Sequence, residues 1–327
     1  MFTMTSIDLF ADRLNSAALH PNFIALRDSA HHTGARNLIN ALYSRMGDPN
    51  GNFDTDFQGP GFHARIFELA CFGYLESAGA TLDRTNEQPD FLGKIGGVDF
   101  ALESTTANVS DGTERDISVL KIGTADDASV DEDECSKRLH RRLLSKVCKN
   151  YHLRPHCQDR PIVLAIAPFF AAGSVFNADQ ALISPLLGCV QQGAPSFDLQ
   201  PVFSMPEAQH ISAVLYCNQF TVPKFWRLSG AFASDSDLSG SRAGLFFGLA
   251  DNEELCLNEY EYRLDDPSVP PETWWQGVTV IHNPRAVVPI KPQILPCSST
   301  IELVEGKISR QIHGFHPINS FMTVKVT

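Results

Sequence analysis

The segment spanning residues 88–105 constrains the fold more than any other part of the chain, because it predicts a β-hairpin. Gly96 and Gly97 form a two-residue turn signal between two strand-like runs, and a turn of this kind pairs residues whose numbers sum to 193. This register places Lys94 opposite Asp99, which is a favourable charge pair beside the turn. It also gathers apolar side chains on the other face of the hairpin: Phe91, Ile95, Val98, Phe100 and Leu102.

The same register places Asp90 opposite Glu103. Two carboxylates that face each other across a ladder repel, because their Cβ atoms are roughly 5 Å apart, and a divalent cation would offset that repulsion. From the residues alone, the alternative is an acidic edge that faces water. A bulge in either strand would also break the pairing.

The composition indicates a globular protein. With 327 residues, 43% of them hydrophobic and 20% charged, the chain can bury a large core as one elaborated α/β domain or as two smaller domains. The sequence has no basic segment followed by an apolar core at its start and no apolar run of membrane-spanning length, so we expect no membrane partner and a cytoplasmic location. Its eight cysteines contain no Cys-x-x-Cys pair, which argues against a zinc ribbon and a disulfide framework.

The net charge of −12 opposes nucleic-acid binding through the whole surface, so any such contact must be local. Residues 137–154 meet that condition, because they carry seven basic residues and no acid. An acidic block precedes them: Asp126, Asp127, Asp131, Glu132, Asp133 and Glu134. A solvated helix face balanced by this acidic block is the alternative interpretation.

The hydrophobic periodicity predicts an alternation of helices and strands. Helical patterns cover residues 6–46, with breaks near Pro21 and at 31–34, and residues 47–61 form a turn-rich connection. The pattern then predicts a helix at 62–79, a strand at 81–83, the hairpin, a polar loop at 108–133, a helix at 134–151 and a buried strand at 161–167. Farther along, residues 211–216, 225–232 and 278–281 are expected to be strands, and 235–241 a polar loop.

Three motifs then suggest a family. They are Phe62 to Leu69 with the sequence FHARIFEL, Pro89-Asp90-Phe91, and Glu103-Ser104-Thr105. Together with the element order, they resemble the PD-(D/E)XK nuclease superfamily, and within it a bacterial branch, over residues 57–168. The resemblance implies an α/β fold with a restriction-endonuclease-like αβββαβ core at residues 61–170, a helical extension at 1–60 and a mixed extension at 171–327. The last segment either continues the same sheet or forms a separate domain.

The resemblance also implies a function. In this superfamily the matching acids hold a divalent metal for phosphodiester hydrolysis, so Glu68, Asp90 and Glu103, with the carbonyl of Ser104, are expected to bind Mg²⁺ or Mn²⁺. The expected partner is nucleic acid, with DNA favoured over RNA. For Glu68 alone, the residues leave open a simple i, i+3 ion pair with Arg65.

One position departs from the family pattern. The superfamily has a lysine two residues after the second acid, on the same strand face, where this chain has Thr105. Some relatives place this lysine on the following helix. Lys146 is the best substitute, because it lies three residues after Leu143 and seven after Leu139, beside the apolar stripe of that helix. Lys137 and Lys149 are weaker candidates.

These observations give one main hypothesis and two alternatives. The expected catalytic residues are Asp90, Glu103, Lys146 and Glu68, and the expected nucleic-acid contacts are Arg65, Thr105, Arg142 and Lys149. A non-catalytic nucleic-acid-binding or structural protein that retains the nuclease fold is the first alternative. An unrelated hydrolase that uses a histidine such as His282 is the second. Residues 171–327 are candidates for a specificity surface or a homodimer contact.

Overall fold

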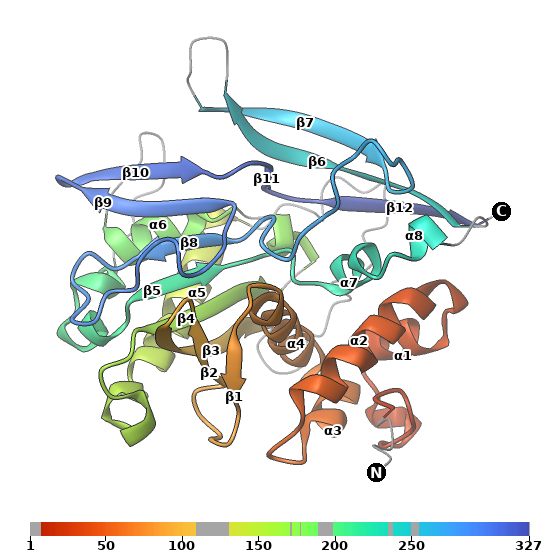
Figure 1. Cartoon of the computed structure of the whole chain (residues 1–327), viewed down its shortest axis with the longest axis horizontal. Helices are drawn as coiled ribbons and strands as arrows, with labels where there is room; N and C mark the ends of the chain where they lie inside the picture. The colour runs from red at the N-terminus through yellow and green to blue at the C-terminus, as the bar shows by residue number, and fades with distance from the viewer. Residues whose placement is uncertain are drawn as a thin grey trace.

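The computed structural model describes residues 8–108, 131–170, 172–176, 178–188, 199–234, 238–249 and 255–326. These residues form a mixed α/β architecture with an eight-stranded sheet and a four-stranded sheet (Figure 1). The α/β class predicted from the sequence is therefore confirmed. None of the helices within the described residues has both the length and the apolar character that a membrane crossing requires.

The large sheet has the order β1-β2-β3-β4-β5-β8-β9-β10. Its strands are β1 (Thr81–Asp83), β2 (Phe91–Ile95), β3 (Val98–Asn108), β4 (Ile162–Phe169), β5 (Ala213–Tyr216), β8 (Thr279–His282), β9 (Ser299–Val304) and β10 (Lys307–Ile312). Strands β1, β2 and β3 pair antiparallel, whereas β3 pairs with β4 and β4 with β5 in parallel. Strands from beyond residue 170 thus extend the sheet that β1 begins.

The predicted hairpin is β2 and β3, and its register is confirmed. Phe91 pairs with Leu102 and Lys94 with Asp99. The turn falls at Gly96 and Gly97, which both have positive φ angles of 57° and 85°, a conformation that glycine adopts without steric cost.

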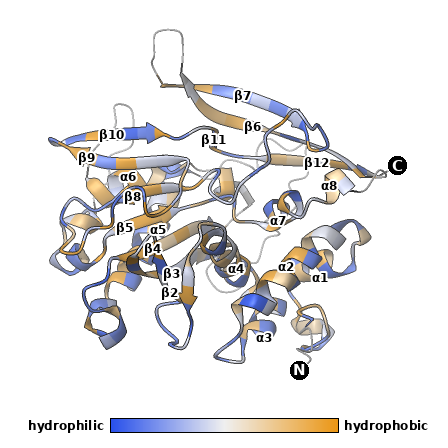
Figure 2. Ribbon diagram, viewed as in Figure 1, coloured by the Kyte–Doolittle hydropathy of each residue, from blue (hydrophilic) through white to orange (hydrophobic). Residues whose placement is uncertain are grey.

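Helices cover both faces of the sheet. Helix α4 (Phe62–Ser77) shares one core cluster with Phe100 and Leu102 of β3, whereas α5 (Glu132–Val147) and α6 (Gln180–Leu187) share the other cluster with Ala101. Strand β4 lies between the two clusters, so all of its residues are buried and it is hydrophobic throughout (Figure 2). The continuous apolar run in its sequence reflects this two-sided burial.

The N-terminal helices pack beside α4 (Figure 1). They are α1 (Pro21–Asp28), α2 (Thr33–Met46) and α3 (Phe53–Gln58). The expected breaks agree with the starts of α1 and α2. The expectation of a turn-rich connection is wrong at residues 53–58, because Phe53 and Phe57 are one helical turn apart and both enter the core.

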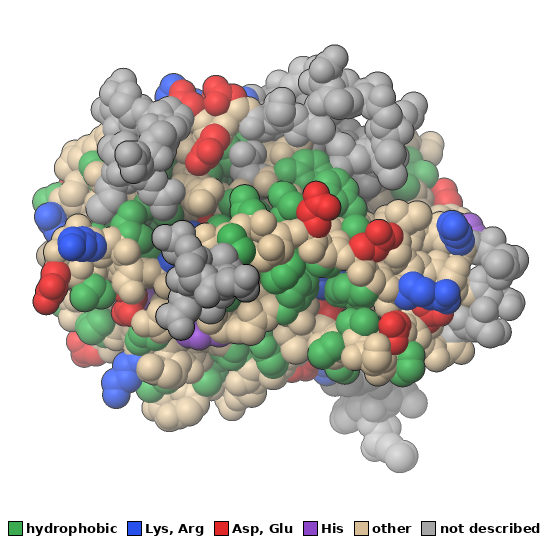
Figure 3. All heavy atoms as spheres, turned by 90° about the horizontal axis from the view of Figure 1, so that it is seen from above, with side chains coloured by type: hydrophobic (Ala, Val, Ile, Leu, Met, Phe, Trp, Pro, Cys, Tyr) green, Lys and Arg blue, Asp and Glu red, His purple; other side chains and the backbone are tan. Residues whose placement is uncertain are grey.

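The remaining strands form the second sheet, with the order β11-β6-β12 and with β7 paired to β6. Its strands are β6 (Leu238–Leu249), β7 (Leu255–Arg263), β11 (His316–Pro317) and β12 (Phe321–Val326). Seen from above (Figure 3), the described part of this face mixes acidic and basic side chains among apolar ones, without a continuous basic surface.

Two expectations near this sheet are wrong. The segment 225–232 is not a strand but contributes to helices α7 (Val222–Leu228) and α8 (Ala231–Ser234). Pro223 suits the first turn of a helix. Phe225 and Trp226, which follow in α7, have buried side chains. The expected loop at 235–241 ends early, because β6 begins at Leu238; residues 235–237 lie outside the described part of the chain. Most of the loop expected at 108–133 also lies outside the described part of the chain. Helix α5 begins at Glu132, after Asp131 as its N-cap.

Candidate active site

Asp90 and Glu103 meet at the beginning of the hairpin. Asp90 directly precedes β2, and its backbone N–H donates to Oε2 of Glu103 at 3.3 Å. The N–H and the hydroxyl of Ser104 both donate to Oδ2 of Asp90, at 2.7 and 2.6 Å. The two carboxylates are therefore neighbours, held by the strand pairing that the sequence predicts.

Lys146 reaches this pair from α5. Its Nζ atom lies 2.6 Å from Oε1 of Glu103, and its side chain is 16% exposed. Leu139 and Leu143 of the same helix are fully buried against the sheet, which orients the neighbouring positions toward the face of β3 that Glu103 shares. One turn earlier, Nε of Arg142 donates to Oγ1 of Thr105 at 2.5 Å.

Tyr151 is a site residue that the sequence analysis missed. It lies in a short 3-10 helix after α5, is buried, and its hydroxyl hydrogen-bonds to Glu103. Burial and the charge of Glu103 raise the pKa of Tyr151 well above its usual range. The hydroxyl therefore keeps its proton at neutral pH and donates a hydrogen bond to Glu103.

Glu68 comes from α4, the helix that packs on the other face of the sheet from α5. Its Oε2 accepts from Arg65 at 2.6 Å and its Oε1 from Arg84 at 3.0 Å, so the ion pair with Arg65 that the sequence left open is present. Burial, followed by the charge of Asp90, raises the pKa of Glu68, although both arginines act in the other direction. Glu68 and Asp90 are thus electrostatically linked, but two guanidinium groups already occupy the Glu68 oxygens.

Arg84 is the second residue that the sequence analysis missed. It follows β1, and its guanidinium lies 5.0 Å from the ring centroid of Phe91. Its Nε and Nη1 atoms are buried and have no hydrogen-bond partner within the described residues. Buried guanidinium donors without partners are energetically costly.

The pKa of Asp90 reflects the balance between burial and the charges around the acidic pair. Burial, and after it the charge of Glu103, raises the pKa of Asp90 to about 6, although the Ser104 donors and Lys146 act in the other direction. A raised carboxyl pKa with a specific charged neighbour is typical of functional sites. This site therefore favours the arrival of a proton or a cation.

The other predicted contacts are placed as follows. Arg65 also pairs with Asp56 at 2.5 Å, in addition to Glu68, so its positive charge is largely engaged. Arg142 and Lys149 are exposed on and just after α5. Lys137 pairs with Asp133 within the helix, so its charge is already engaged. Arg138 similarly pairs with Glu134, so the acidic block balances only the first part of the basic run.

His282 does not join this site. It lies in β8, which is separated from β3 by β4 and β5. It lines a different cavity, with Lys291 and Glu302. A mechanism based on His282 would therefore use another part of the molecule.

Within the described residues, no three His, Cys, Asp or Glu side chains form a group that could hold a metal ion. Asp90 and Glu103 would therefore be the two carboxylate ligands of any ion bound here, and backbone or solvent oxygens would complete its shell. Comparison of the chain with protein-family models, with curated proteins and with solved structures finds no match.

Proposed function

We propose that this chain is a divalent-metal-dependent nuclease with a restriction-endonuclease-like core, acting on DNA. The observation that carries the proposal is the 2.6 Å contact between Lys146 and Glu103. Lys146 comes from the helix after β3. It would supply the amine that the superfamily pattern expects at position 105, where this chain has a threonine.

The topology around the pair supports the same proposal. The order α4-β1-β2-β3-α5-β4, with three antiparallel strands followed by a parallel one, supports the proposal of an αβββαβ core. The two helices lie on opposite faces of the sheet. Such a fold hosts more than one function, so the side chains of the site must carry the chemical argument.

The donor atoms fit a hard divalent cation. Asp90 and Glu103 offer adjacent carboxylate oxygens, the Ser104 carbonyl is the third proposed ligand, and Mg²⁺ and Mn²⁺ prefer oxygen ligands. Burial and the charge of Glu103 raise the pKa of Asp90 although Lys146 lies nearby, and a metal would add further positive charge. When bound, the ion would polarise the phosphate and lower the pKa of a bound water.

The protein groups around the metal ligands would position the substrate and its charge. Lys146 would stabilise negative charge that develops on the phosphate. Tyr151 holds Glu103 in place through its hydroxyl. Exposed Arg142 and Lys149 would contact the nucleic-acid backbone. Glu68 would act mainly by holding Arg65 and Arg84, since its own oxygens are engaged.

A non-catalytic nucleic-acid-binding protein is the second candidate. Lys146 pairs directly with an oxygen of Glu103 that a metal would need. An ion pair that persists in the presence of metal would leave the fold and the basic residues intact but would prevent hydrolysis. DNA binding without cleavage, in Mg²⁺ and in Mn²⁺, is the behaviour that this candidate predicts.

The test is cleavage of supercoiled plasmid DNA in 10 mM Mg²⁺, which is about the concentration at which weak carboxylate sites fill. We expect Glu103→Gln to reduce the cleavage rate by about 10³-fold and Lys146→Met by about 10²-fold. Asp99→Asn is the matched control, because this exposed acid lies on the same hairpin and pairs with Lys94 near the turn; it should cleave normally. If both site variants still cleave DNA, the activity belongs to another site, such as the cavity at His282.

A further inference from the structure

The segment 151–157 follows α5 and lies beside the acidic pair. It consists of two short 3-10 helices, Tyr151–Leu153 and Pro155–Cys157. Tyr151 is 2% exposed and Cys157 is 1% exposed, and both belong to the core cluster that α5 helps to form. The segment is therefore anchored in the core at both of its ends.

This segment contacts both sides of the acidic pair. The hydroxyl of Tyr151 hydrogen-bonds to Glu103. Nη2 of Arg154 donates to Oε1 of Gln88 at 2.7 Å, and Nε2 of His156 donates to the carbonyl oxygen of Gln88 at 2.8 Å. Gln88 lies in the loop that leads into β2. One short piece of chain therefore holds one carboxylate directly and holds the loop that precedes the other.

Pro89 couples the position of Asp90 to that of Gln88. The proline ring fixes the φ angle of residue 89, and the peptide bonds on either side of it are planar. Few rotations therefore remain between the carbonyl of Gln88 and the Cα atom of Asp90. Pro89 is also buried. The contacts of Gln88 thus limit where the Asp90 carboxylate can lie.

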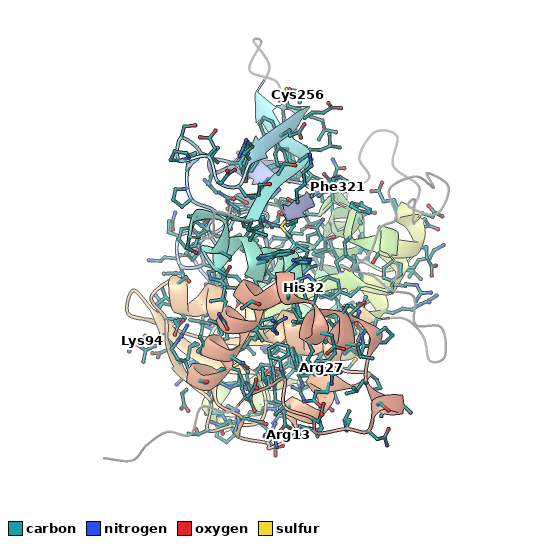
Figure 4. All side chains as sticks on the ribbon, turned by 90° about the vertical axis from the view of Figure 1, so that its right-hand side faces the viewer. Arg13, Arg27, His32, Lys94, Cys256 and Phe321 are labelled. Carbon is teal, nitrogen blue, oxygen red and sulfur yellow. The ribbon has the colours of Figure 1, made fainter. Side chains whose placement is uncertain are left out.

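The two ends of the hairpin differ in what supports them. At the turn, Lys94 lies 3.6 Å from Asp99, and both side chains are exposed; Figure 4 shows Lys94 at the edge of the molecule. At the other end, β2 begins at Phe91, so Asp90 lies just outside the ladder. Strand pairing brings Asp90 close to Glu103, and the contacts of the preceding loop would fix its final position.

We propose that Gln88, Arg154 and His156 are positioning residues that set the separation of Asp90 and Glu103. They act through the loop before β2. The role of the two acids as metal ligands rests on the proposed function, whereas the position of Asp90 does not. The test therefore has one arm that needs neither metal nor DNA.

Hydrogen exchange of the Ser104 amide, followed by NMR, measures the position of Asp90, because this N–H donates to the Asp90 carboxylate at 2.7 Å. In metal-free buffer we expect Arg154→Met to speed up exchange of this amide about tenfold, the effect of weakening one hydrogen bond. Lys94→Met removes an exposed lysine at the other end of the hairpin. It is the matched control and should leave the exchange unchanged. Arg154→Lys retains a donor for Gln88 and should restore most of the protection.

The amides of the β2–β3 ladder separate positioning from general loosening, since the ladder does not include Arg154. They should exchange at wild-type rates in Arg154→Met. Gln88→Leu removes the same contact from its other side and should reproduce the result, so the conclusion does not depend on how well one variant folds. Unchanged exchange at Ser104 in either variant overturns the proposal, as does equally faster exchange across the whole ladder.

The second arm measures plasmid cleavage as a function of Mg²⁺ concentration. Loss of a contact that supports a metal ligand typically weakens metal affinity by about tenfold or more. Arg154→Met should therefore need about ten times more Mg²⁺ for its half-maximal rate, with KM for DNA unchanged. A higher KM with an unchanged Mg²⁺ requirement would make Arg154 a nucleic-acid contact and would overturn the positioning role. A wild type that does not cleave DNA contradicts the nuclease proposal, and the exchange of Ser104 then still decides what positions Asp90.

Discussion

Two clusters of charged side chains in this protein each hold a carboxylate largely away from water, Asp90 in one and Glu272 in the other, and the pKa values of these two carboxylates shift in opposite directions. Burial and the neighbouring Glu103 raise the pKa of Asp90 to about 6. Burial alone would also raise the pKa of Glu272, but Arg227, Arg242 and Lys224 together lower it to about 2. The neighbours, not the burial, therefore decide the direction of the shift.

The geometry shows why the two clusters serve different purposes. Glu272 lies 2.6 Å from Arg227 and 3.5 Å from both Lys224 and Arg242, and the Arg242 guanidinium donates to four further side chains: Ser320, Tyr262, Gln276 and Gln219. These contacts join α7 to the second sheet. The Glu272 cluster is saturated and structural, whereas the Asp90 and Glu103 pair has Lys146 as its close cation and can accept another.

The largest effect that this comparison predicts concerns Glu272. Glu272→Gln should lower the free energy of unfolding by about 3–5 kcal/mol, because it leaves buried cations without their counter-ion. Urea denaturation at pH 7 measures the change. Asp265→Asn, which removes an exposed acid paired with Arg263, is the control and should change stability by less than about 1 kcal/mol. A loss for Glu272→Gln no greater than the control would break the comparison.

Asp90→Asn should act in the opposite direction. In metal-free buffer at pH 7 it should raise the free energy of unfolding by about 1–3 kcal/mol, because it removes a charge whose ionisation the fold opposes. The same urea titration measures it. The same variant should lose DNA cleavage, so that stability and activity change in opposite directions at one residue.

The pH dependence of this gain checks its cause. The pKa of Asp90 is about 6 in the folded protein and 3.8 in the unfolded chain, so the folded protein binds more protons between these values. The contribution of Asp90 to stability is therefore fully present below pH 3.8 and lost as the pH rises through 6. Asp90→Asn and the wild type should have equal stability at pH 3.5 and diverge by pH 7. A gain that is the same at both pH values would point to improved packing instead.

The sequence predicted the acidic pair because local rules determine it. Gly96 and Gly97 fix a tight turn, and the turn fixes which residues face each other. Lys146 was predicted for a similar reason, since its spacing from Leu139 and Leu143 places it beside a stripe that must be buried. A turn and a helix period are both short-range properties, so they can be read from a few neighbouring residues.

The residues that the sequence missed depend on long-range packing. Arg84 follows a three-residue strand and meets Glu68 from another element, and no periodic pattern marks that approach. The Glu272 cluster joins residues 224, 227, 242 and 272, which only the packing of α7 against the second sheet brings together. The strand expected at 225–232 failed because its apolar residues are also compatible with a short buried helix.

Magnesium should distinguish the two clusters directly. Addition of 10 mM Mg²⁺ should raise the free energy of unfolding of the wild type by about 1–2 kcal/mol, which corresponds to a ligand at roughly ten times its dissociation constant. Thermal unfolding with and without EDTA measures the change. Asp90→Asn should lose this stabilisation, whereas Glu272→Gln should retain it on a lower baseline. Equal stabilisation of all three proteins would show that the ion binds elsewhere.

The smallest effect tests whether the element that supplies the proposed catalytic cation matters. Thr105 lies two residues after Glu103 on the same strand face, so a lysine there would approach the acidic pair from β3 instead of α5. In a Lys146→Met background, Thr105→Lys should recover cleavage by about tenfold. Recovery should be partial, because Thr105 is buried and Arg142 occupies the space beside its hydroxyl.

Plasmid cleavage rates at saturating DNA measure this recovery, and circular dichroism confirms that each variant is folded. Lys149→Met is the matched control. Loss of this exposed lysine, which lies just after α5, should weaken DNA binding and its salt dependence without reducing the rate at saturation. A folded double variant that stays as slow as Lys146→Met would show that an amine near Glu103 is not sufficient. Cleavage would then require an amine that approaches Glu103 from α5. The difference between the acidic pair and the Glu272 cluster would depend on which element carries the cation as well as on the number of cations.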